Sequence, residues 1–392
     1  MRKTVLIVVP ALAAIAAAAV FFRAHSSLNR ASLPSAAGPT VTLTDLAGRS
    51  VTLPARIERI VLIRSRDIYS LSMLLGDEVE TKIVAWGPDV QTSDKDAYAK
   101  YLHRYPRLGQ IPLLGSVFSD AVSVEAVLAL KPDLVVGDVF MIERGYKCIE
   151  KLQQAAVPIV FTDQSSDPYS GPQRSIAMLG RALGKESRAR EIVAFMNQEL
   201  EKVLSRLGTI KPGGPSVYIE SGHLGPSQYG NSYGSDSSGK STAWGMALSR
   251  LPCRNIALGV APAMGPISAE HLLKSDPDVI VITGANWPAA ADTMHLGYST
   301  SPGEARKLLE GFTRRPGWEH LSAVRNRRVY TVFHGFVMHP TFYACVQQMA
   351  KWFYPQTFAD LDPAASLGEF HKRFMPFECS GTWMLELDGS DR

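Results

Sequence analysis

The clearest pattern of hydrophobic and polar positions in the chain is a helix followed at once by a buried strand. Within Ser123–Gly137, apolar residues fall at positions i, i+3 and i+4, which predicts a short helix with one apolar face. Pro132 ends that helix, and the apolar run after it predicts a buried strand. The same arrangement recurs at Ser268–Gly284, with identical spacing of its serine, glutamate, proline and aspartate. Two related α/β lobes are the simplest explanation.

Further apolar runs place the first of these units in a longer alternation of strands and helices. Strands are predicted at 59–63, 83–86 and 158–162, with helical segments between them. This order indicates a parallel α/β lobe. We therefore expect an α/β fold with two Rossmann-like lobes, the first over residues 41–168 and the second over 209–334.

Two helical regions complete this division of the chain. Residues 172–207 form one long amphipathic stretch, which predicts a single linking helix within 169–208, although Gly184 could interrupt it. Residues 335–392 are rich in aromatic residues and predict a helical C-terminal extension.

The N-terminus reads as an export signal. Arg2 and Lys3 precede the apolar run 5–22, which predicts a signal peptide or an uncleaved signal anchor over 1–23. Residues 24–40 are rich in Ser, Ala, Gly and Pro and predict a disordered tether. The expected location is the periplasm. The net charge of +4 owes much to the flanks of this run, so nothing indicates a nucleic-acid surface.

Export would bring four cysteines into an oxidising compartment. Three pairings are possible, and we favour Cys345–Cys379 because it would staple the extension. Four free thiols are the alternative.

The two-lobed pattern resembles the helix-linked substrate-binding proteins of ABC importers, which carry ferric siderophores, haem, vitamin B12, metals or oxyanions. The resemblance covers roughly residues 41–358 and rests on VEAVLALKPDLVV, RIVLI, AEHLLKSDPDVIVITG and the Asn-Ile-Ala before the second unit. It implies two lobes joined by one long helix, a ligand cleft between the lobes, and a monomer that delivers its ligand to a dimeric membrane permease.

The same resemblance assigns a role to the acids in the two repeated units. In this family, glutamates at the helix start of each lobe dock onto arginines of the permease, and Glu125 and Glu270 occupy those positions. Either glutamate alone could equally be a carboxylate that interacts with the helix dipole. The matched pair favours docking.

Cationic side chains are the first ligand candidates. Arg64 and Arg66 follow a strand and precede a helix, at the carboxyl edge of a parallel sheet where ligands bind. They stand where relatives of this family carry small polar residues, and surface arginines are the alternative reading. Lys240 ends a match to the phosphate-loop pattern at 234–241. No buried strand precedes the match, so we expect an anion-compatible helix start rather than a nucleotide site.

Aromatic and histidine side chains near strand ends are the remaining candidates, since aromatic walls suit a large planar or chelated ligand. The ligand-binding set adds Trp86, Tyr146, Tyr229, Tyr233, Trp287, His334 and Phe336. Packing is the alternative for each. His334 and His339 are weak metal-ligand candidates.

We therefore expect non-catalytic capture of an Fe(III)–siderophore or similar metal chelate, with no intrinsic cofactor. Cobalamin or haem is the first alternative, and an oxyanion such as molybdate is the next. A periplasmic hydrolase is the alternative from another class, but the chain has no H-E-x-x-H motif.

Overall fold

The computed structural model describes residues 38–164, 166–210, 213–235, 239–241, 243–287 and 291–387. The chain separates into two units, Met1–Thr40 and Val41–Arg392, and the fold described below is that of the second unit. The predicted signal segment and almost all of the tether lie outside the described residues, as do three residues of the phosphate-loop match. None of the described helices is both long enough and apolar enough to cross a membrane.

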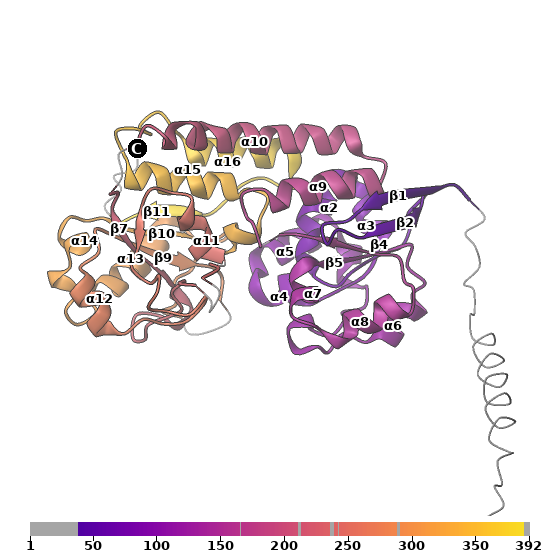
Figure 1. Cartoon of the computed structure of the whole chain (residues 1–392), viewed down its shortest axis with the longest axis horizontal. Coiled ribbons are helices and arrows are strands. Elements are labelled where there is room, and N and C mark those ends of the chain that lie inside the picture. The colour runs from indigo at the N-terminus through magenta and orange to yellow at the C-terminus, as the bar shows by residue number, and fades with distance from the viewer. Residues whose placement is uncertain are drawn as a thin grey trace, which may run out of the picture. The chain divides into compact units, whose positions relative to one another are not determined.

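The first lobe is built on a four-stranded parallel sheet with the order β4-β3-β5-β6 (Figure 1). Its strands are β3 (Ile60–Leu62), β4 (Ile83–Trp86), β5 (Leu134–Asp138) and β6 (Ile159–Thr162). A separate hairpin precedes them, formed by β1 (Thr40–Thr44) and β2 (Ser50–Pro54). The helices are α2 (Ile68–Leu75), α3 (Val79–Lys82), α4 (Asp89–Ser93), α5 (Lys95–Arg104), α6 (Val124–Ala129), α7 (Val139–Glu143) and α8 (Lys147–Gln154). The predicted parallel α/β lobe is confirmed.

The second lobe has a five-stranded sheet with the order β11-β10-β9-β7-β8. Four strands are parallel: β7 (Ser216–Ser221), β8 (Arg254–Asn255), β9 (Val279–Gly284) and β10 (Val329–Phe333). The last strand, β11 (Met384–Glu386), pairs antiparallel with β10. The helices of this lobe are α11 (Ala243–Ser249), α12 (Ala269–Ser275), α13 (Pro302–Thr313) and α14 (Ser322–Arg325).

The repeated sequence units form equivalent structures in the two lobes. The Ser123 and Ser268 side chains accept hydrogen bonds from the third residues after them, at the starts of α6 and α12. Asp133 and Asp278, which precede β5 and β9, each accept a backbone N–H at the start of the neighbouring strand, from Arg59 and Ser216. The repetition in sequence therefore reflects repetition in structure.

The predicted linking helix is two helices rather than one. α9 (Gly171–Ala182) packs on α2 and β6 of the first lobe, and α10 (Glu186–Leu207) continues to α15 and α16. The chain turns between them at Gly184, whose φ of 65° is readily adopted only by glycine. The link between the lobes is therefore α10 alone, which is shorter than the linking helix predicted within 169–208.

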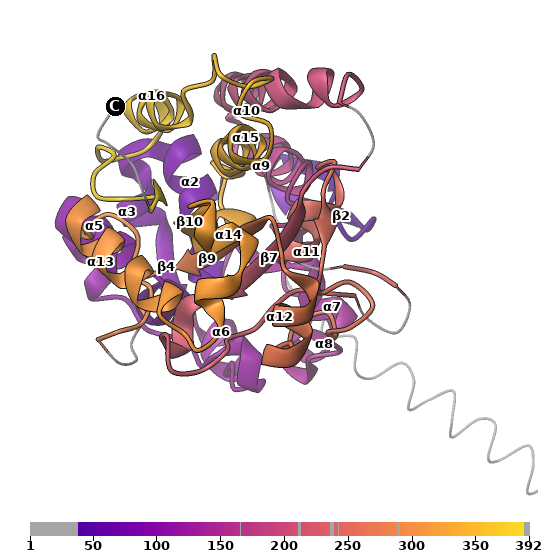
Figure 2. The same cartoon turned by 90° about the vertical axis from the view of Figure 1, so that its left-hand side faces the viewer.

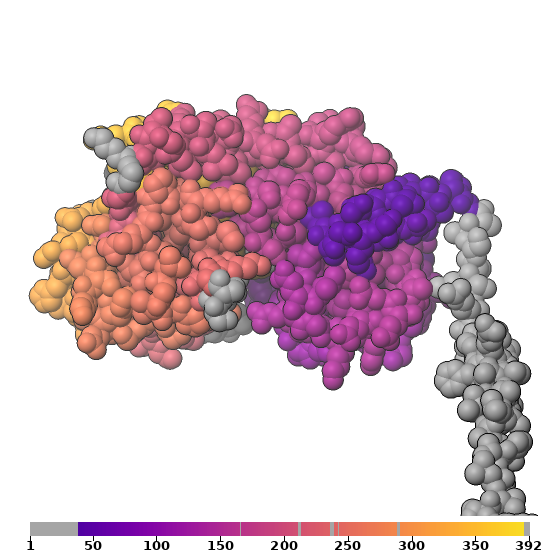
Figure 3. Space-filling view, in the orientation of Figure 1, coloured from indigo at the N-terminus to yellow at the C-terminus, as the bar shows by residue number. Residues whose placement is uncertain are grey.

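The C-terminal extension is not wholly helical, because β11 joins the second sheet. Its helices α15 (Phe342–Phe353) and α16 (Pro363–Phe374) pack with α10, and the three group on one side of the sheets, opposite α6 and α12 (Figure 2). The space-filling view shows one face of both lobes, the first in purple and magenta and the second in orange (Figure 3).

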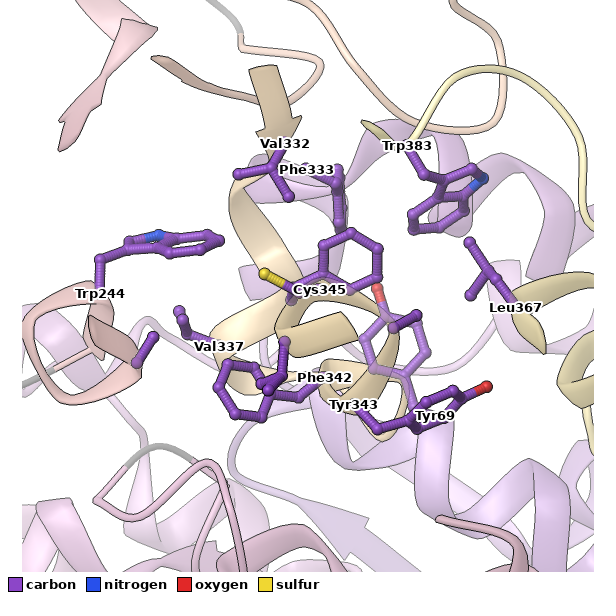
Figure 4. Packing of buried hydrophobic residues seen from close by; sticks show 14 of the residues in the cluster. Tyr69, Trp244, Val332, Phe333, Val337, Phe342, Tyr343, Cys345, Leu367 and Trp383 are labelled. Carbon is purple, nitrogen blue, oxygen red and sulfur yellow. The ribbon is translucent and has the colours of Figure 1, made fainter. Parts of the chain in front are cut away.

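All four cysteines are unpaired, so the predicted Cys345–Cys379 disulfide is wrong. Cys345 lies on α15 in the hydrophobic core, among Trp244, Val337 and Phe342 (Figure 4). Cys379 is only half-buried, on the segment that leads to β11. Cys345 thus acts as a small apolar core residue.

Candidate ligand site between the lobes

Charged side chains gather where the strands of the first lobe end. Arg64 and Arg66 follow β3, Asp89 follows β4, and Asp138 ends β5. Both arginines are buried, with exposed fractions of 2% and 7%. The Asp138 carboxylate accepts a hydrogen bond from Arg64 Nη1 at 3.3 Å. The sheet edge therefore brings together the two cations that the sequence singled out, as expected for the carboxyl edge of a parallel sheet.

Asp89 fixes the turn that carries the two arginines. Its Oδ1 accepts hydrogen bonds from the backbone N–H of Ser65 at 2.6 Å and from the Ser65 hydroxyl at 2.8 Å. Its Oδ2 accepts one from the backbone N–H of Arg66 at 3.3 Å. The guanidinium groups contribute only longer ion pairs, at 3.7 Å from Arg64 Nε and 3.8 Å from Arg66 Nε. Asp89 thus holds the backbone of the turn more closely than it holds either charge.

Two guanidinium N–H groups at this edge are buried and lack a partner. Arg64 Nε and Arg66 Nη1 make no hydrogen bond to any of the described residues. A buried unpaired donor costs roughly 1–3 kcal/mol, and more when it is charged. Such groups are compatible with an acceptor that the protein itself does not supply.

Arg64 lies at the boundary with the second lobe. Its Nη2 donates to the Met338 thioether at 3.5 Å, and Met338 follows β10. Its guanidinium also lies 5.1 Å from the centroid of the Phe140 ring and 5.9 Å from that of Phe118. Residues from both lobes therefore surround this cation.

Histidine and tryptophan side chains form the facing wall of the second lobe. His334 Nδ1 and the Thr283 hydroxyl are hydrogen-bonded at 2.7 Å, and the Trp287 ring lies edge-on to His334 with centroids 4.9 Å apart. Tyr233 and Trp244 are the next rings, at 6.4 and 6.2 Å. Burial, and then the positive charge of Arg66, lower the pKa of His334 to about 3. This wall is therefore neutral near pH 7 and faces the arginines.

His339 contacts the first lobe directly. Its ring lies edge-on to Tyr69 of α2, with centroids 4.4 Å apart, and its Nδ1 is hydrogen-bonded to the Thr341 hydroxyl at 2.7 Å. Its Nε2 is buried without a partner among the described residues. Burial lowers the pKa of His339 well below its usual value, so the ring is neutral.

Among the residues that the structure describes, no three or more His, Cys, Asp and Glu side chains are grouped so that they could hold a metal ion. His334 and His339 each already share one ring nitrogen with a threonine hydroxyl.

Several other predicted ligand residues lie elsewhere. Tyr229 packs in the second lobe, where its hydroxyl accepts a hydrogen bond from Trp318 and its ring covers Arg315. Phe336 is fully buried against Phe333 and Trp383. These contacts are those of core residues.

The remaining candidates lie around the edge of the boundary. Trp86 ends β4 and is buried, and its indole N–H lacks a partner among the described residues. Tyr146 is half-exposed before α8 and packs edge-on against Phe140. Lys240 is exposed, and its Nζ lies 4.0 Å from Glu143 of the other lobe.

One contact between the lobes was not predicted. Asp96, in the first turn of α5, accepts hydrogen bonds from Asn286 Nδ2 at 2.7 Å and from the Ser299 backbone and hydroxyl at 3.1 and 2.7 Å. No local pattern signals it, because the partners lie about 200 residues away and meet Asp96 only when the lobes assemble.

Glu125 and Glu270 lie in the first turns of α6 and α12. Both are exposed. In the views of Figures 1 and 2, both helices lie on the side opposite α10.

The chain is similar in sequence and in fold to known proteins. The chain matches the periplasmic binding protein family over residues 79–333. The crystal structure of the TroA-like periplasmic binding protein FepB from Veillonella parvula is 32% identical, with a TM-score of 0.82, over 89% of this chain and 100% of that one.

Two curated proteins are similar over most of their length. The uncharacterized ABC transporter substrate-binding lipoprotein YvrC of Bacillus subtilis is 26% identical over 82% of this chain and 87% of its own. The molybdate-binding protein MolA of Haemophilus influenzae is 23% identical over 85% of this chain and 90% of its own. The chain belongs to the periplasmic binding protein family, in the helix-linked form that the sequence resemblance predicts.

Proposed function

We propose that this protein is the substrate-binding component of an ABC importer, and that it captures an anionic metal chelate of the Fe(III)–siderophore class between its lobes. The observation that carries the proposal is a pair of buried guanidinium donors at the lobe boundary, Arg64 Nε and Arg66 Nη1, that make no hydrogen bond to the described residues. Hydrogen bonds from charged donors to anionic oxygens are about twice as strong as neutral ones. An anionic chelate would satisfy both donors.

The His334 and Trp287 side chains of the second lobe, which face the arginines, are uncharged. Such a surface suits a chelate with aromatic or extended groups. Indole N–H groups of Trp86, Trp244 and Trp287 are also buried without a partner among the described residues. They would add directional donors without adding charge. His334 and His339 are neutral there, so they would not compete with the arginines for the anion.

A free oxyanion such as molybdate is the second candidate. The similarity to MolA over most of both chains favours it, together with the same arginine donors. A molybdate ion would use the two arginines and leave much of the aromatic wall without a ligand contact. Haem or cobalamin would need fewer cationic side chains than the anionic ligands, so either one matches the two buried arginines less well.

Delivery to a membrane partner completes the proposal. Glu125 and Glu270 project from equivalent helix starts on the two lobes, which suits a permease dimer with two equivalent cationic sites. We propose a monomeric carrier exported to the periplasm, with no catalytic role and no intrinsic cofactor.

Calorimetric titration of the full chain distinguishes these ligands. The probes are a ferric tris-catecholate chelate, molybdate, haem and cyanocobalamin, with the iron-free catecholate as the matched control. We expect the ferric chelate to bind most tightly and the iron-free control to bind weakly or not at all. Tightest binding of haem or cobalamin would overturn the assignment to anionic chelates.

A further inference from the structure

The floor of the candidate site contains more acids than bases. Two guanidinium groups, Arg64 and Arg66, interact with four buried carboxyl groups, those of Asp67, Asp89, Asp94 and Asp138. If all four carboxyl groups were ionised, the floor would carry excess negative charge. An anion placed above such a floor would be repelled, and a proton taken up by one carboxyl group would weaken that repulsion.

The four carboxyl groups differ in the hydrogen bonds that they accept. Asp138 accepts from Arg64 and from two backbone N–H groups, and Asp89 accepts from two backbone N–H groups and a hydroxyl. Asp94 accepts from the Tyr69 hydroxyl at 2.5 Å and from the Ala97 backbone. Both oxygens of Asp89 and of Asp138 therefore accept hydrogen bonds, as do both oxygens of Asp94.

Asp67 is the least satisfied of the four. Its Oδ1 accepts from the Thr162 hydroxyl at 3.0 Å and from Gln164 Nε2 at 3.2 Å. Its Oδ2 is buried with no partner among the described residues, and so is Gln164 Oε1, the oxygen of the same amide. A proton on Oδ2 would remove a buried unpaired charge and create a donor next to an amide that still needs one.

We infer that Asp67 is a proton-binding site beneath the ligand, so that an anionic ligand and one proton occupy the site together. This inference rests on the proposed capture of an anion. It identifies a regulatory residue of that site that makes no contact with the ligand itself.

The electrostatic surroundings support this inference. Burial, and then the negative charge of Asp138, raise the pKa of Asp67 to about 7, while Arg64 opposes the rise. The other charged or titratable groups that face this floor are Arg66, Asp89, Asp94 and Asp163 from the first lobe, and His334 and His339 from the second. Both histidines stay neutral. Burial also raises the pKa of Asp94 and of Asp138, but arginine charges and hydrogen bonds oppose those rises. Asp67 differs in that its Oδ2 has no hydrogen-bond partner among the described residues.

A proton on Asp67 makes the affinity for an anionic ligand depend on pH. An anion bound near Asp67 raises its pKa further, so binding takes up a proton at any pH between the free and bound values. Affinity should be constant well below pH 7, where Asp67 is already protonated, and should fall by up to about tenfold per pH unit above it.

Calorimetry of the full chain tests this directly, with molybdate and a ferric tris-catecholate chelate as probes because neither gains protons near pH 8. Titrations at about pH 8 in two buffers of different ionisation enthalpy give the number of protons taken up. We expect close to one for the wild type and none for Asp67→Asn, which mimics the protonated acid. Asp163→Asn is the matched control, since Asp163 is also buried but pairs with Arg174, and it should keep the uptake.

Equal proton uptake by Asp67→Asn, or none by the wild type, would overturn the inference. If neither probe binds at any pH, the proposed ligand class fails, and infrared spectra of the ligand-free chain then decide the proton site. A carboxylic-acid band that the wild type loses as the pH rises through 7, and that Asp67→Asn lacks, would support it. Absence of that band in the wild type would overturn it.

Discussion

The carboxylate of Asp96 accepts a hydrogen bond from the hydroxyl of Ser299 at 2.7 Å, and this contact joins the two lobes. The Ser299 backbone and Asn286 donate to the same carboxylate, so three donors of the second lobe converge on one side chain of the first. The contact lies beside the proposed site, because Asn286 precedes Trp287.

Asp96→Ala should loosen this contact. Removing a buried charged acceptor leaves its donors unpaired, so we expect a loss of about 1–3 kcal/mol in the free energy of unfolding. Hydrogen exchange should rise at the Ser299 amide, which Asp96 binds directly. Asp77→Ala, which removes an exposed acid paired with Arg104, is the control. Unchanged exchange at Ser299 would contradict the role given to Asp96.

Arg66→Ala should weaken the binding of an anionic ligand by about 1.5–3 kcal/mol, the size of one hydrogen bond to a charged group. Arg66 is a sharper test than Arg64, because loss of Arg64 would strand the buried Asp138 carboxylate and damage the fold. Calorimetry with the tightest-binding probe measures the effect. The exposed Arg144→Ala serves as control, and equal affinities for all three proteins would remove Arg66 from the site.

Arg315 and Glu220 form a buried pair that should stabilise the second lobe. The guanidinium donates to both Glu220 oxygens, at 2.6 and 2.9 Å, and to three backbone carbonyls. Arg315→Met would leave the buried Glu220 carboxylate without its cation. We expect the free energy of unfolding, measured with denaturant, to fall by about 3–5 kcal/mol.

The neighbouring Arg314 provides the matched control, since it is mostly exposed and pairs only at 3.8 Å with Glu310. Arg314→Met should change the unfolding free energy by no more than about 0.5 kcal/mol. Similar losses for the two variants would show that the buried pair has no special role.

Glu125→Ala combined with Glu270→Ala should leave ligand binding intact and abolish delivery. Both carboxylates are exposed at helix starts, so each should cost the fold only about 0.3–1 kcal/mol. Stimulation of transporter ATPase activity in vesicles measures delivery. The control is Glu150→Ala with Glu304→Ala, which removes exposed first-turn acids from one helix of each lobe. Normal stimulation by the Glu125/Glu270 variant would end the docking assignment.

Local patterns predicted most of the fold. The serine caps and proline stops of the two repeats fixed α6, α12 and the strands after them, because those signals act within a few residues. The arginines at the edge of β3 were predicted by the same local logic. The short strand β11 was missed, since it exists only through pairing with β10.

Contacts between distant residues decide where the candidate site residues lie. Tyr229 resembles a cleft aromatic in sequence, but its ring covers Arg315, which lies 86 positions along the chain. The burial of Asp67 and Gln164 could not be predicted from sequence, because the hydrogen bond between them joins segments almost 100 positions apart. Only the packed sheet brings such residues together.

Native mass spectrometry of the full chain, purified without added ligand from the periplasm of its own organism, tests the central claim most directly. The account predicts a ligand-bound species whose excess mass and visible spectrum correspond to an anionic ferric chelate, and Arg66→Ala should lose that species. A bound haem or cobalamin, or a ligand retained equally by Arg66→Ala, would contradict it.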